Sequence, residues 1–361
     1  MRYFIPGIVA GVILNIFLFS PVNGIEIYPE WTGALKDISS IDKNHKGSKH
    51  ANTVITLRQG PDLYRLGGDG TLISHVSSGD KILAASGSGE YYITYEKVGS
   101  SLEFYRITGE PFWKLDSREY PYLSRTGKLI FMMNGDHSRI RFIDFNGNPA
   151  GDRQVVGRLC TVIAFSAHSD FGATGFLDGS WHVVSPEGKI VYSGRMPAGN
   201  MVKGIALSPG GKFAAVHYGS PDGDRIRIAG IMDGKFREID TETVHAVKIS
   251  MHIRDNGLMT YIDREYLVHA DKRGRILFRI KIPARRPGYA SLDFNNGVYS
   301  AGYTGESGYA RLILFRDDGN ILLSREFPSE SIIRSVLRDN LLILRGSDNL
   351  YCYSLHRESD E

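Results

Sequence analysis

The chain has 361 residues, of which 42% are hydrophobic, so it can form one large closed domain with a sizeable core. Its 41 glycines and many aromatic residues suit short strands joined by tight turns. A net charge of +3 is too small to indicate a nucleic-acid-binding protein.

The first 24 residues are predicted to be a secretory signal peptide. Arg2 precedes an uncharged apolar run, and the small residues Val22 and Gly24 occupy the −3 and −1 positions of a cleavage site. The alternative is an uncleaved membrane anchor, since Phe4 to Val22 is just long enough to cross a bilayer. Either interpretation places the remaining chain outside the cytoplasm, in the periplasm, secreted, or tethered to the inner membrane.

Three further segments follow this leader. Residues 25–52 are expected to be a polar linker or arm, whose first residues, 25–31, could dock on the folded domain. Residues 53–357 are expected to form a single domain, and residues 358–361 a short tail.

A polar turn that ends in glycine and precedes a short apolar strand recurs seven times, at spacings of 38 to 46 residues. The glycines are Gly70, Gly109, Gly147, Gly188, Gly234, Gly274 and Gly319. A repeat of about 40 residues that is built from strands and turns indicates a β-propeller.

A second series of turns lies between these glycines, so each repeat is predicted to contain four antiparallel strands. The clearest repeat has strands at 202–208, 212–218, 225–231 and 235–240, and apolar residues alternate along the third. The ends of the chain, residues 53–76 and 332–355, are predicted to close the ring by sharing one blade. The prediction is therefore an all-β, seven-bladed propeller, with eight blades as the alternative.

The hairpin at 101–116 resembles the repeat of quinoprotein-like (PQQ-like) propellers, in which a Thr-Gly turn precedes a strand bearing a docking tryptophan. Thr108, Gly109 and Trp113 match this pattern. The turn at 208–212 is similar to the turn of WD40-type propellers. The resemblance implies the propeller fold over most of residues 53–355.

We find no motif that predicts a catalytic residue, a metal ligand or a cofactor. Ser166, His168 and Asp170 are close in sequence, but a tight turn rarely lets such residues converge as a triad. The 11 histidines lack metal-binding spacing. Cys160 and Cys352 are expected to be small buried residues rather than a disulfide.

One basic segment lacks any acidic residue and is proposed as an interaction surface. Its members are Lys272, Arg273, Arg275, Arg279, Lys281, Arg285 and Arg286. It could bind an acidic protein, an anionic polymer or lipid headgroups, or it could be a solvated outer strand whose charges block edge pairing. The loops at 219–224 and 302–308 are further candidates for contact.

We therefore expect a non-catalytic module that binds envelope proteins or anionic polymer or lipid surfaces outside the cytoplasm. One alternative is an enzyme or small-ligand binder that uses the central channel, such as a lyase, a glycosidase or a quinone-dependent oxidoreductase. Another is a membrane-tethered sensor domain.

Overall fold

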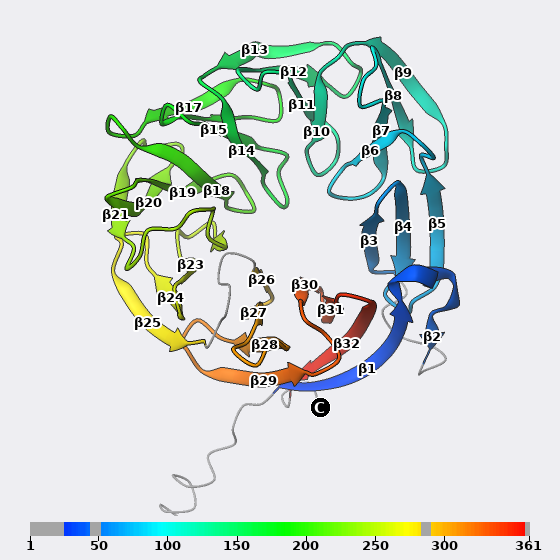
Figure 1. The fold of residues 1–361 in the computed structure, drawn as a ribbon, viewed down its shortest axis with the longest axis vertical. Coiled ribbons are helices and arrows are strands. Elements are labelled where there is room, and N and C mark those ends of the chain that lie inside the picture. The colour runs from blue at the N-terminus through cyan, green and yellow to red at the C-terminus, as the bar shows by residue number, and fades with distance from the viewer. Residues whose placement is uncertain (1–24, 44–51, 283–289, 358–361) are drawn as a thin grey trace, which may run out of the picture.

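The computed structural model describes residues 25–43, 52–282 and 290–357, and it is an eight-bladed β-propeller (Figure 1). The blades surround a central channel, and we number them in chain order. Eight sheets are formed by the described residues, so the all-β propeller prediction is confirmed with the alternative count of eight blades. The predicted signal peptide or anchor, residues 1–24, lies outside the described residues. In the described part of the chain, no helix has the length and hydrophobicity needed to cross a membrane.

Blades 2 to 4 each contain four antiparallel strands in sequence order from the channel outward. Blade 2 has β6 (Ile82–Ala85), β7 (Tyr91–Tyr95), β8 (Ser101–Arg106) and β9 (Pro111–Asp116). Blade 3 has β10 (Tyr120–Leu123), β11 (Leu129–Met133), β12 (Arg139–Asp144) and β13 (Pro149–Val156). Blade 4 has β14 (Cys160–Phe165), β15 (Gly172–Phe176), β16 (Ser180–Val184) and β17 (Ile190–Arg195).

Blades 5 to 7 repeat this arrangement. Blade 5 has β18 (Met201–Leu207), β19 (Phe213–Ser220), β20 (Gly223–Gly230) and β21 (Phe236–Asp240). Blade 6 has β22 (Met251–Ile253), β23 (Met259–Asp263), β24 (Tyr266–Ala270) and β25 (Ile276–Lys281). Blade 7 has β26 (Ser291–Asn295), β27 (Val298–Thr304), β28 (Ala310–Phe315) and β29 (Ile321–Phe327).

Blade 8 joins the two ends of the chain, as the sequence predicts, but through a different N-terminal segment. It contains β30 (Arg334–Arg338), β31 (Leu341–Arg345), β32 (Asn349–Arg357), β1 (Ile25–Ala34) and β2 (Asp42–Lys43), and the 3₁₀ helix η1 (Leu35–Ser40) follows β1. β1 pairs antiparallel with β32 from Ile25↔Arg357 to Ala34↔Asn349. Residues 25–34 therefore form a paired strand rather than part of a polar linker. This pairing buries Ile25 and Trp31.

Blade 1 has only three described strands, β3 (Val54–Gln59), β4 (Asp62–Gly67) and β5 (Leu72–Ser77). The β4–β5 turn contains Gly70, the first glycine of the repeat, so β4 and β5 correspond to the third and fourth strands of other blades. β3 therefore corresponds to a second strand. The position of an innermost strand is not filled by any described strand of this blade.

The direction of β3 confirms this assignment. In neighbouring full blades the inner strands run parallel, since Ser335 N of β30 donates to Oγ of Ser291 and Leu337 N donates to Oδ2 of Asp293, both on β26. By contrast, Thr53, which precedes β3, contacts Asp339, which follows β30. β3 therefore runs antiparallel to β30, as a second strand does.

Apolar side chains between adjacent blades form the core, and indole rings secure two of the blade junctions. Trp113 Nε1 on the outer strand β9 donates to the Phe145 carbonyl oxygen of blade 3 over 2.9 Å. Trp31 Nε1 on β1 donates to the Gly68 carbonyl oxygen of blade 1, also over 2.9 Å. Gly147 and Gly70 have φ of 82° and 78°, and a Cβ there would lie about 3 Å from the indoles of Trp113 and Trp31 respectively. Trp113 thus docks on the next blade as the resemblance implies.

Candidate binding site

A pocket of about 550 Å³ lies beside β3, where blade 1 has no described inner strand. We call it the arginine pocket, because six arginines line it with only two acidic residues, Glu90 and Asp339. The arginines are Arg58, Arg65, Arg125, Arg334, Arg338 and Arg345. They come from blades 1, 3 and 8, so the fold gathers charges that are far apart in the sequence.

Few of these arginines are neutralised by a carboxylate. Among the described residues, only Arg65 and Arg338 have a carboxylate oxygen within 4.0 Å, from Glu90 at 4.0 Å and Asp293 at 3.7 Å. The Nε atom of Arg65 is buried without a described hydrogen-bond partner. The pocket therefore carries an excess of positive charge that an anionic group could neutralise.

Arg334 and Arg345 concentrate this charge at one end of the pocket. They lie directly opposite each other on β30 and β31, and like charges in that position repel. Burial, together with the charge of Arg334, lowers the pKa of Arg345 below its usual value. Arg345 also donates from Nη1 to the Arg58 carbonyl oxygen over 3.1 Å. This bond holds one guanidinium against the edge of β3.

Apolar side chains lie between the arginines. Val54, Ile55 and Leu57 of β3 line the pocket, as do Val336 and Ile343 of blade 8. The site therefore combines cationic groups, apolar surface and a strand edge, which are the features of a site for an extended polypeptide rather than for a small hydrated ion.

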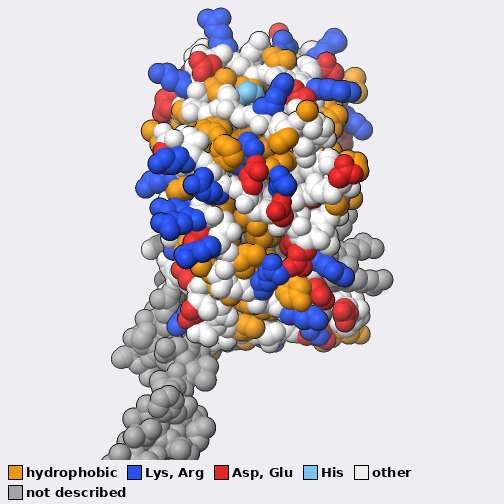
Figure 2. Space-filling model, turned by 90° about the vertical axis from the view of Figure 1, so that its left-hand side faces the viewer, with side chains coloured by type: hydrophobic (Ala, Val, Ile, Leu, Met, Phe, Trp, Pro, Cys, Tyr) orange, Lys and Arg blue, Asp and Glu red, His pale blue; other side chains and the backbone are white. Residues whose placement is uncertain are grey.

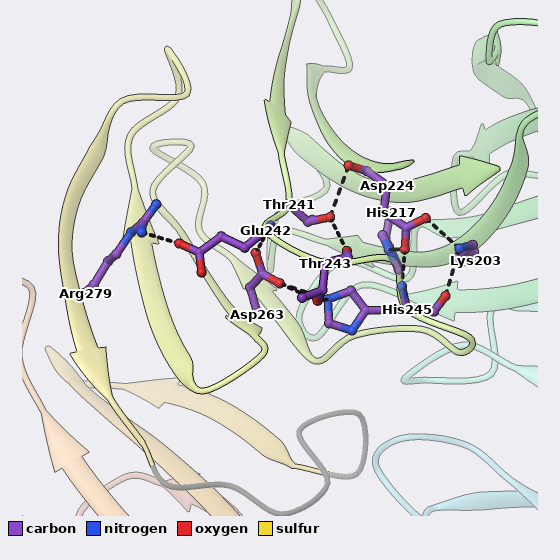
Figure 3. Close-up of polar contacts among 9 residues, drawn as sticks. All are labelled: Lys203, His217, Asp224, Thr241, Glu242, Thr243, His245, Asp263 and Arg279. Carbon is purple, nitrogen blue, oxygen red and sulfur yellow. Dashed lines mark hydrogen bonds and ion pairs between the residues drawn. The ribbon is translucent and has the colours of Figure 1, made fainter. Parts of the chain in front are cut away.

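A second polar cluster lies between blades 5 and 6 and is buried (Figure 3). Asp224 on β20 accepts hydrogen bonds from Lys203 Nζ at 2.6 Å and from the backbone nitrogen of His245 at 2.8 Å, and it lies 2.9 Å from Nε2 of His217. His217 is fully buried, and burial lowers its pKa to about 4 despite the adjacent carboxylate. Burial opposes ionisation of Asp224, but these hydrogen bonds hold its pKa below the usual value.

The same cluster extends into blade 6. His245 Nε2 lies 2.9 Å from Asp263 Oδ1, and the backbone nitrogen of Glu242 donates to Asp263 Oδ2 over 2.6 Å. Arg279 forms an ion pair with Glu242 at the outer end (Figure 3). The cluster thus fastens the connection between β21 and β22 to both blades. Among its buried groups, Nδ1 of His217 has no described hydrogen-bond partner. We assign it a structural role, because a reacting group must be accessible to substrate.

The predicted basic segment is partly neutralised. Arg275 pairs with Asp271 at 2.9 Å, Lys281 with Glu265 at 3.7 Å, and Arg279 with Glu242. These residues lie on or beside β25, an outer strand, and Figure 2 shows lysines and arginines interspersed with carboxylates on that side of the molecule. Lys272 and Arg273 are exposed in the turn before β25. Arg285 and Arg286 lie outside the described residues.

The other predicted residues are placed in structural roles. Asp170 accepts hydrogen bonds from Thr126, and Ser166 and Ser169 bond each other at 3.0 Å within a turn. Cys160 and Cys352 are free thiols. Residues 220–223 form the β19–β20 hairpin, and Ser220, Asp222, Gly223 and Asp224 are among the residues that line a second pocket of about 460 Å³. No group of His, Cys, Asp or Glu suited to a metal ion occurs within the described ranges.

Sequence reasoning missed the arginine pocket because its lining depends on pairings between distant segments. One signal was present in the sequence. Two strands of the predicted globular domain precede the first glycine turn, at residue 70, whereas three strands of the same repeat precede each later glycine turn. That shortfall indicates an incomplete first blade. The arginines themselves are dispersed singly and form no run.

No family model matches the chain, and no curated protein matches it in sequence. Three solved structures have similar folds at 12% identity each. The structure described as dihydro-heme d1 dehydrogenase NirN in complex with DHE gives a TM-score of 0.56 over 86% of this chain and 76% of that chain.

The other two are a chain of the mitotic checkpoint complex and the β-propeller domain of Myceliophteria thermophila Cps50 (Swd1). The first gives a TM-score of 0.49 over 75% of this chain and 86% of that chain. The second gives 0.47 over 84% of this chain and 99% of that chain. At this identity a likeness establishes the fold alone. The chain has the β-propeller fold.

Proposed function

We propose that this propeller is a non-catalytic interaction module of the cell envelope, and that it binds a partner protein at the arginine pocket. The observation that carries the proposal is the excess of four positive charges around the open edge of β3. The arginines are carried by strands and turns of three blades, so the closed ring fixes the relative positions of their backbones.

The proposed location outside the cytoplasm rests on the N-terminal sequence. Residues 1–24 combine Arg2, an apolar run and small residues at a cleavage position, as secretory signals do. An uncleaved leader would keep the propeller at the membrane surface on the same side. Both forms let the propeller reach envelope proteins.

The distribution of polar groups supports binding rather than chemistry. His217, one of three histidines whose pKa burial lowers to about 4, is fully buried beside Lys203 and Asp224, whereas the arginine pocket is lined by arginines. Arginine is always protonated and donates in a fixed planar geometry, so it suits recognition of carboxylates better than proton transfer.

The proposal can be tested by photo-crosslinking in intact cells of the native host. A photoreactive amino acid replaces Val336 in the pocket, and in a matched control it replaces Lys272 on the outer rim. We expect a discrete cross-linked protein from position 336, recovered in the envelope fraction, and no such product from position 272. Products from neither position, or recovery only from the cytoplasm, would contradict the proposed function.

A further inference from the structure

We propose that the partner inserts an extended acidic segment beside β3, where it forms the missing inner strand of blade 1. This inference rests on the proposed function and names the chemistry of the partner.

The edge of β3 that faces the channel is free of strand partners among the described residues. β4 is the only described strand that pairs with β3. Gly68 N donates to the Thr53 carbonyl oxygen, so the backbone groups of Thr53 point toward β4. Successive residues of a strand point these groups to opposite sides, so those of Val54, Thr56 and Arg58 point away from β4. The Arg345 guanidinium already donates to the outward carbonyl oxygen of Arg58. This edge offers alternating donors and acceptors that an added strand would pair with.

The inner position of blade 1, which no described strand fills, has the dimensions of one short strand. The inner strands of the other seven blades contain three to seven residues. Since a first strand runs antiparallel to a second strand, the inserted segment would run antiparallel to β3 and parallel to β30. A segment of about six residues would span β3.

The placement of the arginines predicts that every second residue of the inserted segment is acidic. Arg334, Arg338 and Arg345 all belong to blade 8, and side chains of a strand alternate between its two faces. Every second residue of the inserted strand would therefore face these three guanidinium groups. The remaining side chains would meet the opposite wall, toward blades 2 and 3, where Ser88 and Arg125 line the pocket.

This chemistry favours a partner segment over other occupants. The chain's own residues 44–51, which precede β3, include Lys46 and Lys49 and no acidic residue, so their charge does not complement the pocket. A polyphosphate or a lipid headgroup would neutralise the arginines but would have no amide hydrogen to donate to the outward carbonyl groups of Val54 and Thr56.

The test measures binding of fluorescein-labelled hexapeptides to the purified chain by fluorescence anisotropy. The main probe alternates Glu and Val, and a second probe has the same composition in the order Glu-Glu-Glu-Val-Val-Val. A third keeps the alternating sequence but carries N-methyl groups on alternate residues, which removes the backbone donors of one edge. Two further probes, polyphosphate and phosphatidylglycerol vesicles, are used as competitors.

We expect the alternating peptide to bind, and the N-methylated and reordered peptides to bind at least tenfold more weakly. Arg334→Gln and Arg345→Gln should each weaken binding about tenfold, as expected for loss of one charged hydrogen bond. The matched control, Lys235→Gln with Arg237→Gln at the outer strand of blade 5, should leave binding unchanged, because both residues are exposed and lie outside the arginine pocket. Circular dichroism of each variant verifies that the fold is retained.

Equal binding of the N-methylated and unmethylated peptides would overturn the inference, because no backbone pairing would be involved. Tighter binding of polyphosphate or of the vesicles with the same arginine dependence would also overturn it, in favour of a simple anion site. If the peptides fail but cross-linking at position 336 still captures an envelope protein, this inference is wrong while the proposed function stands. If cross-linking also fails, both are wrong.

Discussion

Thr53 donates a 2.7 Å hydrogen bond from Oγ1 to Oδ2 of Asp339, although the two residues are 286 positions apart in the chain. The bond places the start of β3 against the end of β30. It therefore establishes that β3 runs opposite to the inner strand of the adjacent blade. This direction identifies β3 as a second strand, and the arginine pocket lies beside it, where no described strand fills the inner position of blade 1.

Replacing Trp31 with alanine should strongly destabilise the protein. Trp31 is fully buried between blade 8 and blade 1, and its indole donates to Gly68. Loss of the side chain should reduce the free energy of unfolding by about 3–5 kcal/mol, because a large cavity forms at the junction that closes the ring. Urea denaturation of the variant measures this change.

The matched control is Tyr28→Ala, on the same strand. Tyr28 is 46% exposed, so its replacement should cost less than about 1 kcal/mol. Equal effects of the two substitutions would show that β1 is not docked through Trp31.

Arg334→Gln should stabilise the fold while it weakens binding. Arg334 lies directly opposite Arg345, and removal of one of two like charges relieves their repulsion. We expect the free energy of unfolding to rise by about 0.2–1 kcal/mol in low salt, and the gain to shrink as salt screens the charges. A loss of stability would indicate that Arg334 serves the fold rather than a partner.

The pairing of Lys203 with Asp224 should behave as a coupled buried ion pair. Lys203→Met leaves the Asp224 carboxylate buried without its cation, which should cost about 3–5 kcal/mol of the free energy of unfolding. In the double variant with Asp224→Asn, the uncompensated charge is gone, so the cost should be smaller than the sum of the single changes. A double-mutant cycle in urea measures the coupling, and strict additivity would contradict the buried network in Figure 3.

Stability should fall as the pH drops below neutrality. Burial lowers the pKa of His217, His252 and His269 to about 4, from a usual value of 6.5. Between these values the unfolded chain binds more protons than the folded chain, so the folded state loses stability as the pH falls from about 6.5 to about 4. Urea denaturation at a series of pH values measures the slope.

His252→Phe provides the matched variant for this profile. His252 packs against Phe294 and Tyr299, so a phenyl ring retains the packing and removes one titrating group. The slope between pH 6.5 and 4 should decrease in this variant. A flat profile in the parent protein would contradict the buried neutral histidines.

The sequence predicted the repeat because its turns carry their own local signal. Gly70 and Gly147 need positive φ, and such glycines recur at the spacing of a blade, so four strands per repeat could be predicted from neighbouring residues alone. The strand boundaries in blade 5 agree with the prediction to within two residues. The local turn and strand propensities were sufficient to predict the strands of this blade.

Long-range pairings set the features that sequence reasoning missed. Residues 25–34 have a mixed polar composition and become a strand only because β32 offers them an edge. The pocket arginines are scattered from Arg58 to Arg345, and only the ring closure brings them together. The acids that neutralise the basic segment include Glu242 on the connection from blade 5, which no reading of the segment itself would reveal.

Amide hydrogen exchange at single-residue resolution tests the central claim, strand addition at the arginine pocket, most directly. In the free protein, the amides of Val54, Thr56 and Arg58 should exchange faster than those of Ile55 and Leu57, which face β4. Saturation with the alternating acidic peptide should slow the first three amides at least tenfold and leave the other two unchanged. Binding without this alternating protection, or equal protection of all five amides in the free protein, would contradict the account.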